Sequence, residues 1–245
     1  MRYWHALAIL AALPAPALAQ NNAAPSIIVT SDGTVDTPPD IATLTFAVRG
    51  EGSTADEAVG AMTARQKAVL QGLRSLDHNL EVSTGAVTIN EAYSGNCTAS
   101  SGRKITLSTG DCAIAGRVAR IETTVVMNSA KDAGTAIGLA GRLGAANAEI
   151  QSFGLRDPQA ARRRAVAAAA TQARARAQAI ADASGAKLGP IISVTDYDRG
   201  EIIMYRTPAE SADGVRDFAP PIIVEIDPKA VKTTVQLTIT FGLEK

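Results

Sequence analysis

The stretch from Asp157 to Gly185 constrains the fold most, because it predicts one long helix within a chain of 245 residues. Asp157 suits the N-cap position, Pro158 suits the first helical turn, and Gly185 suits the left-handed residue just past the end. The residues between them are mostly alanine, the strongest helix former, and arginine. At ~1.5 Å per residue the helix would be roughly 40 Å long. One side, with steps of three and four residues, consists of small and apolar side chains and is expected to face a partner surface: Val166, Ala170, Ala173, Ala177, Ile180 and Ser184.

The first 19 residues are typical of a signal peptide. Arg2 precedes an apolar run from Ala6 to Ala19, whose small residues at the end suit cleavage between Ala19 and Gln20. The run is shorter than a membrane span of ~20 residues. We therefore expect an exported mature chain, residues 20–245; the alternative is an uncleaved N-terminal anchor.

The charge of this mature chain is nearly balanced. Without Arg2 it has 23 basic and 24 acidic side chains, a net charge of −1. Proteins that bind nucleic acid usually show a strong basic excess. Nucleic acid is therefore not an expected partner.

Cys97 and Cys112 are the only cysteines in the chain. In an exported protein such a pair predicts a disulfide that closes the loop between them. A zinc site is the weaker alternative, because it would need further cysteine or histidine ligands. We expect no cofactor and no bound metal.

Strands are predicted where apolar and polar residues alternate. A short strand at 27–30 is expected to end in a turn at Ser31-Asp32-Gly33. Clear alternation follows at 42–48, at 80–93, at 119–127 and, most regularly, at 234–243, and shorter strands are expected near 148–155 and 188–194.

Two further helices are expected between these strands. Ser53 with Asp56, and Ser129 with Asp132, resemble capping boxes at their starts, and the helices should end near Leu76 and Leu143. The second contains Gly134, Gly138 and Gly141. These glycines indicate a helix that lies close to the sheet, or alternatively a partner surface.

The predicted fold class is α+β, a mostly antiparallel sheet with about three helices on one face. Two β-α-β units in tandem, at about 26–93 and 114–197, precede a loop at 198–221 and a C-terminal strand at 222–243. The other sheet face would be rich in threonine and either exposed to water or buried in an assembly: Thr43, Thr45, Thr124, Thr234, Thr238 and Thr240.

Few residues suggest chemistry. A catalytic triad needs an activating base, usually histidine, and His78, in a polar turn, is the one histidine of the mature chain. The sequence therefore does not favour such a triad. Asp196, Asp198 and Glu201 could hold a cation or act as acid and base, but more simply form a solvated loop. Five arginines of the long helix could face an anion such as a lipid headgroup, or simply form the solvent-exposed face of that helix: Arg162, Arg163, Arg164, Arg174 and Arg176.

An ordered series of local motifs resembles the SIMPL-domain family, which includes the 26–28 kDa immunogenic proteins of the bacterial outer membrane and periplasm. The motifs that carry this resemblance are, in chain order, Pro39-Asp40-Ile41-Ala42, Ser53-Thr54-Ala55-Asp56-Glu57-Ala58, Val82-Ser83-Thr84, Ile89-Asn90-Glu91-Ala92-Tyr93, Gly116, Phe153-Gly154-Leu155-Arg156-Asp157 and Ile180-Ala181 with Gly185, Leu188 and Gly189. Ser31-Asp32-Gly33 and Pro228-Lys229 depart from the family's Gly-x-Gly and Pro-Gly. The resemblance implies a periplasmic or secreted protein of a Gram-negative bacterium, associated with the outer membrane in some members. It also implies self-assembly and links to oxidative stress, without established catalytic residues.

Two hypotheses of function follow. The first is a non-enzymatic envelope protein that forms a homo-oligomer and protects against oxidative or envelope stress. The second is a module that binds a small ligand or a lipid, in a pocket between helices and sheet. An enzyme is not expected.

Overall fold

The computed structural model describes residues 24–93, 109–197 and 222–244. The predicted signal peptide with Ala19 and Gln20, the segment containing Cys97, and residues 198–221, predicted to form a loop, lie outside the described residues. The elements, in chain order, are β1 (Ser26–Thr37), β2 (Ile41–Gly52), α1 (Ala55–Leu76), β3 (Glu81–Tyr93), a short 3-10 helix (Gly110–Cys112), β4 (Ile114–Met127), α2 (Ala133–Arg142), β5 (Ala145–Gly154), α3 (Pro158–Ala183), β6 (Lys187–Tyr197) and β7 (Val231–Glu244). The predicted α+β class with antiparallel strands is confirmed.

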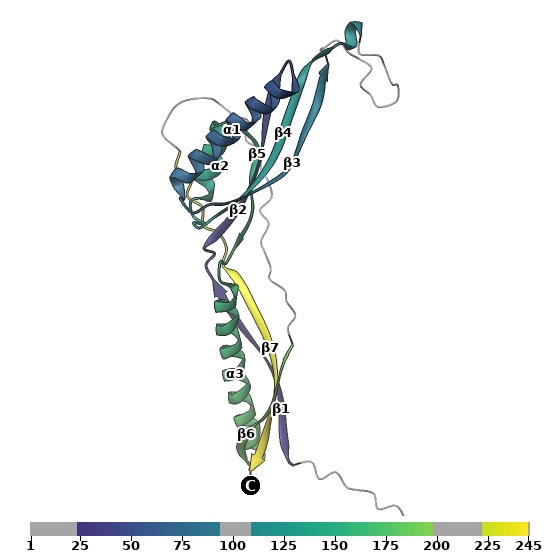
Figure 1. Ribbon diagram of the computed structural model, residues 1–245. Coiled ribbons are helices and arrows are strands. Elements are labelled where there is room, and N and C mark those ends of the chain that lie inside the picture. Colours follow the sequence, from purple (N-terminus) through teal and green to yellow (C-terminus); the bar gives the residue numbers. More distant parts are fainter. Residues whose placement is uncertain (1–23, 94–108, 198–221, 245) are drawn as a thin grey trace, which may run out of the picture.

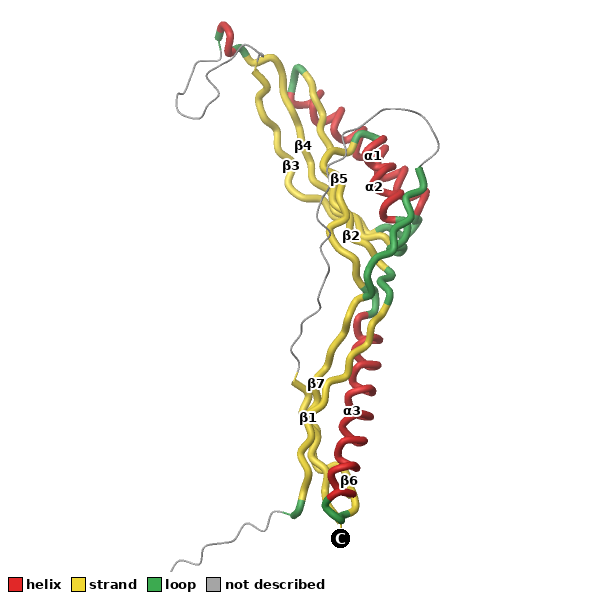
Figure 2. The backbone as a smooth tube through the Cα atoms, turned by 180° about the vertical axis from the view of Figure 1, so that it is seen from behind, coloured by secondary structure: helices red, strands yellow, loops and turns green. Residues whose placement is uncertain are grey.

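The strands form two sheets rather than one. A four-stranded sheet in the order β3-β4-β2-β5 packs with α1 and α2, and we call this part the lobe. A three-stranded sheet in the order β1-β7-β6 packs with α3, and we call this part the arm. Figures 1 and 2 show the two parts end to end in an elongated molecule.

The lobe is a contiguous insertion in the arm. β2 to β5 follow one another in the chain, whereas the arm combines β1 from one end of the chain with α3, β6 and β7 from the other. β1 pairs with β7 over its whole length, from Ser26 opposite Gly242 to Thr37 opposite Val231. Each of the two β-α-β units expected from the sequence therefore contributes to both parts.

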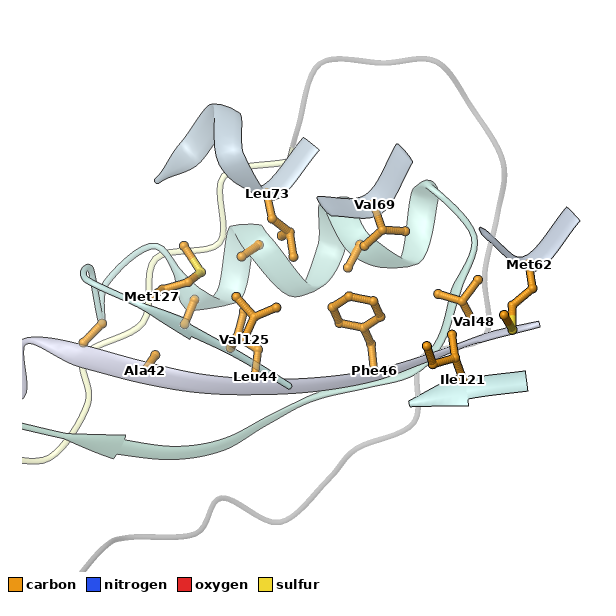
Figure 3. Packing of buried hydrophobic residues seen from close by; sticks show 14 of the residues in the cluster. Ala42, Leu44, Phe46, Val48, Met62, Val69, Leu73, Ile121, Val125 and Met127 are labelled. Carbon is orange, nitrogen blue, oxygen red and sulfur yellow. The ribbon is translucent and has the colours of Figure 1, made fainter. Parts of the chain in front are cut away.

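The core of the lobe follows from period-two alternation in β2. Leu44, Phe46 and Val48 point to the helices and are 0–1% exposed. Val69 and Leu73 of α1 pack onto them (Figure 3). Alternation places every second residue of a strand on one face, so this row of β2 side chains all points into the core between the sheet and the helices.

The core of the arm depends on alanine in α3. The fully buried positions recur at every fourth residue, with exposed fractions of 0–1%: Ala161, Ala165, Ala169, Ala173, Ala177 and Ala181. The predicted stripe was right at Ala173 and Ala177, and Val166 and Ala170 pack half-buried against the same core. It was wrong at its C-terminal end, where Ile180 is 44% exposed and Ser184 is exposed. A step of four residues turns ~40° beyond a full helical turn. The buried row therefore winds around α3, as β1 and β7 coil past it in Figure 1.

The predicted turn at Ser31-Asp32-Gly33 is wrong, because β1 runs straight through it. Gly33 instead allows the backbones of β1 and α3 to approach each other closely. A Cβ atom built there would lie 2.0 Å from the carbonyl oxygen of Ala165 and 2.4 Å from the amide nitrogen of Ala169. The buried Ser31 hydroxyl donates to the Ala169 carbonyl at 2.7 Å.

The helix starts also differ in detail from the prediction. Thr54 and Glu57, not Ser53 and Asp56, form the capping box of α1. Asp132 precedes α2 without a capping bond from its side chain. At α3 the prediction is confirmed: Asp157 accepts from the amide of Ala160, and Gly185 has φ +70°.

The last predicted strand begins at Val231 and not at residue 222. Residues 222–230 cross α2 as an irregular segment: the Val224 amide donates to Thr135 Oγ1 at 3.1 Å, and Ile226 packs on the lobe core. Gly134 allows this contact, because a Cβ atom there would lie 2.9 Å from the Val224 carbonyl oxygen. Gly138 and Gly141 have nothing within 4 Å of such an atom, so close packing does not explain them.

Candidate functional site

The arginines of α3 mainly contact the arm itself. Arg162 forms an ion pair with Asp196 at 2.7 Å, and Arg164 donates to Thr37 Oγ1 at 3.0 Å. Arg163 lies 3.5 Å from the Asp157 carboxylate.

The two remaining arginines lie nearer the end of α3. Arg176 Nη1 donates to the carbonyl of Thr30 in β1 at 3.3 Å. Arg174 is exposed. The five side chains are thus spread along α3, and a role facing an anion stays a prediction.

The acidic candidates are only partly described. Asp196 lies at the end of β6 and is held by Arg162, while Asp198 and Glu201 fall outside the described residues. In the described ranges, no three His, Cys, Asp or Glu side chains lie close enough to hold a metal ion together. His78 lies in the exposed turn after α1. Cys112 lies in the short 3-10 helix, and its predicted disulfide with Cys97 stays a prediction.

The threonines predicted on one sheet face are divided between the two sheets. Thr45 pairs with Thr124 in the lobe. In the arm, Thr30 and Thr238 share a hydrogen bond of 2.8 Å, and Thr34 and Thr234 one of 3.2 Å. These pairs lie on the sheet face away from α3, because the alternate residues of β1 and β7 are buried against that helix.

A polar cluster at the end of α1 was not predicted from the sequence. The Asp77 carboxylate accepts hydrogen bonds from the backbone of Asn79 and Asn128, at 2.9 and 2.7 Å, and from the Asn128 side chain at 3.1 Å. Burial acts to raise the pKa of Asp77, but these bonds and the charge of Arg156 together lower it below 3.8. The cluster joins the end of α1 to the segment that follows β4.

Arg156 lies where the lobe meets the arm. Its Nη1 contacts Glu81 at 2.6 Å, and its backbone amide donates to Asp40 Oδ1 at 2.7 Å. The Asp40 amide in turn donates to the Gly154 carbonyl at 3.1 Å. The chain passes between the arm and the lobe twice, before β2 and after β5, and these two connections are therefore hydrogen-bonded to each other.

A hollow of about 400 Å³ lies where β2 ends beside the β3–β4 hairpin. Small residues and charged ones line it: Arg49, Glu51, Gly52, Ala92, Ala115, Gly116, Arg117 and Val118. Arg49 contacts Glu51 at 3.1 Å, and Arg117 contacts Glu91 at 2.9 Å. The hydrogen bond from the Tyr93 hydroxyl, helped by Arg117, lowers the pKa of Glu91. This site is not the pocket between helices and sheet that the sequence suggested.

Large apolar side chains are exposed on several edge strands, among them Ile28 of β1, which is 68% exposed. On β3 they are Val87, 49% exposed, and Ile89, 46% exposed. At the far end of the arm, Ile191, Ile192 and Val194 of β6 are 52–57% exposed. These strands lie at the edges of their sheets.

No helix in the described part of the chain is long and apolar enough to cross a membrane. A comparison with curated proteins finds no match. A family model described as "SIMPL: Protein of unknown function (DUF541)" matches residues 27–241, from β1 to β7, and so includes both the lobe and the arm. The match extends over most of the chain, and the protein therefore belongs to the SIMPL family.

Proposed function

We propose that this protein is a non-enzymatic component of the cell envelope that assembles with copies of itself. The observation that supports assembly most is the exposed apolar surface on edge strands β3 and β6. An edge strand has backbone groups that its single neighbour cannot pair, and monomeric proteins usually protect such edges with charges or cover them. Apolar side chains that gather on such an edge favour association.

The location and the stress role depend on the family resemblance. The resemblance implies a periplasmic or secreted protein with links to protection against oxidative stress. We therefore place this protein in the periplasm and propose that its assembly protects the envelope under oxidative stress.

The oligomeric state of the mature chain, residues 20–245, tests the assembly. Size-exclusion chromatography with light scattering at 1–100 micromolar should give a defined multimer. A monomer throughout that range would contradict the proposal.

A separate experiment tests the protective role. A strain without the protein should survive hydrogen peroxide less well than its parent, and survival should return when the gene is supplied. Equal survival of the two strains would contradict protection while leaving assembly standing.

A ligand-binding module is the second candidate, and the hollow beside Arg49 and Arg117 favours it. The two guanidinium groups would suit a small anion better than an acyl chain. Native mass spectrometry of protein purified from its own periplasm should then detect a bound small molecule. Protein that carries no ligand would remove this candidate.

A further inference from the structure

The lobe sheet places two arginines directly opposite each other. Arg49 of β2 and Arg120 of β4 are register partners, so their side chains leave the same face of the sheet, with Cβ atoms roughly 5 Å apart. Their neighbours Val48 and Ile121 are buried in the core beneath the helices. The two arginines, which we call the arginine pair, therefore lie on the face away from α1 and α2 (Figure 1), and both are exposed.

Only one member of the arginine pair is compensated within the described part of the chain. Arg49 contacts the Glu51 carboxylate at 3.1 Å. Arg120 forms no ion pair or hydrogen bond with a described residue, although Glu122 lies two residues further along β4 on the same face. Like charges at directly opposite positions destabilise a sheet. A sheet that keeps such a pair, with one charge unmatched, is suited to an anion from outside the chain.

The hollow of about 400 Å³ lies beside the arginine pair. On the same sheet face, β4 continues from the pair to Val118 and then to Gly116, which is opposite Ala92 of β3. All three residues line the hollow, and their small or apolar side chains leave room next to the arginines. Glu122 lies on the other side of the pair, away from the hollow. A space of this size accepts a small organic molecule.

Arg117 also lines the hollow, but its charge is already matched. It is the register partner of Glu91 in β3 and contacts that carboxylate at 2.9 Å. Arg117 and Arg120 are three residues apart in one strand, so their side chains leave opposite faces of the sheet. The unmatched charge beside the hollow is therefore that of Arg120.

We propose that Arg49 and Arg120 together bind the phosphoryl group of a small phosphate ester, whose organic part occupies the hollow. This inference rests on the second candidate function, the ligand-binding module, and names its site and ligand class. A guanidinium group presents a planar fork of N–H donors that matches the oxygens of phosphate. The three terminal oxygens of a phosphoryl group can accept from two such forks at once, whereas the two oxygens of a carboxylate pair fully with one.

Calorimetric titration of the mature chain, residues 20–245, with glycerol 3-phosphate tests the site. Arg49→Gln and Arg120→Gln should each weaken binding at least tenfold. Arg174→Gln is the matched control, because Arg174 of α3 is also exposed and without a described partner, and it should bind within twofold of the wild type. Glu51→Gln should bind at least threefold more tightly, because Arg49 loses its competing carboxylate.

Two measurements check that the effects come from the charges. Arg120→Gln should melt at the same temperature as the wild type or higher, because the substitution removes a repulsion between neighbouring strands. Acetate should bind at least tenfold more weakly than glycerol 3-phosphate. A wild-type chain that binds no glycerol 3-phosphate, or that binds acetate equally well, would overturn the phosphoryl site.

The remaining outcomes separate the arginine pair from the other proposals. Binding that Arg120→Gln leaves intact, or that Arg174→Gln weakens as strongly, would overturn the pair. Sedimentation with phosphatidylglycerol vesicles, compared with uncharged phosphatidylcholine vesicles, tests a lipid headgroup as the source of the phosphate. Binding to the anionic vesicles alone, without binding of the soluble ester, would overturn the small ligand. Native mass spectrometry of the purified protein decides on the ligand-binding module itself, and the titration decides on the arginine pair.

Discussion

At the scale of single residues, glycines of this chain have opposite roles that composition alone does not distinguish. Gly33 lies in β1 against the backbone of α3, while Gly60 lies on the exposed side of α1 with nothing within 4 Å of a built Cβ atom. The sequence around Gly33 suggested a turn, because Ser, Asp and Gly are typical turn residues. Only the packing of α3, whose residues lie more than a hundred positions away, explains that glycine.

Gly33→Ala should lower the free energy of unfolding by about 2–3 kcal/mol, because the new methyl group would overlap backbone atoms that cannot rotate away. Gly60→Ala should raise it by about 1 kcal/mol, because alanine is the better helix former in an exposed helix interior. Urea denaturation followed by circular dichroism measures both. A Gly33→Ala variant as stable as the wild type would show that β1 and α3 are not in close backbone contact at Gly33.

Asp77→Asn should lower stability by about 1 kcal/mol at pH 7, because the charged acceptor of the Asn79 and Asn128 hydrogen bonds is lost. The lowered pKa of Asp77 means that its contribution is fully present above the ordinary value of 3.8 and is lost as the pH falls through the folded value. The difference from wild type should therefore shrink below about pH 4. Thermal unfolding between pH 2.5 and 7 measures it, with Asp227→Asn in the exposed segment before β7 as a control. A difference that stays constant with pH would contradict the role of the charge.

At the scale of elements, most helices and strands were predictable because their signals are local. Alternation in β2 and β7 and the cap and stop residues of α3 lie within the elements themselves. The buried face of α3 was only partly predictable. The helix contains both buried and exposed alanines, and composition does not show which of them form the buried row that winds around it. The contacts of candidate site residues were not predictable at all: Arg162 meets Asp196 only because β6 returns along α3.

Ala173→Leu should lower stability by about 1–3 kcal/mol, because the larger side chain must fit between α3 and the arm sheet. Ala175→Leu, at an exposed position of the same helix, should change stability by less than about 0.5 kcal/mol. Thermal melting of the two variants gives the comparison. Equal melting temperatures would indicate that the alanine row does not pack closely on β1 and β7.

At the scale of the whole molecule, the two cores differ in how they depend on each other. The buried residues of the lobe core all lie between Ala42 and Phe153, so this core can form from one stretch of chain, to which the segment before β7 adds the half-buried Ile226. The arm must bring β1 to α3 and β7 across the entire lobe. Local patterns predicted a single sheet, because alternation identifies a strand but not its partner. The split into two sheets follows from the long-range pairing of β1 with β7.

Phe46→Ala in the lobe core should therefore destabilise the arm as well, whereas Ala173→Leu in the arm should leave the lobe unchanged. When the lobe is unfolded, the arm must close a loop formed by residues 38–157, at an entropic cost on the order of 4 kcal/mol. A folded lobe holds the ends of that loop in place. Hydrogen exchange followed by mass spectrometry distinguishes the two cases, since peptides from β1 and β7 report on the arm and peptides from β2 and β4 on the lobe. Phe46→Ala should speed exchange in all four strands and Ala173→Leu only in β1 and β7; a Phe46→Ala variant with wild-type exchange in the arm would show that the two parts fold independently.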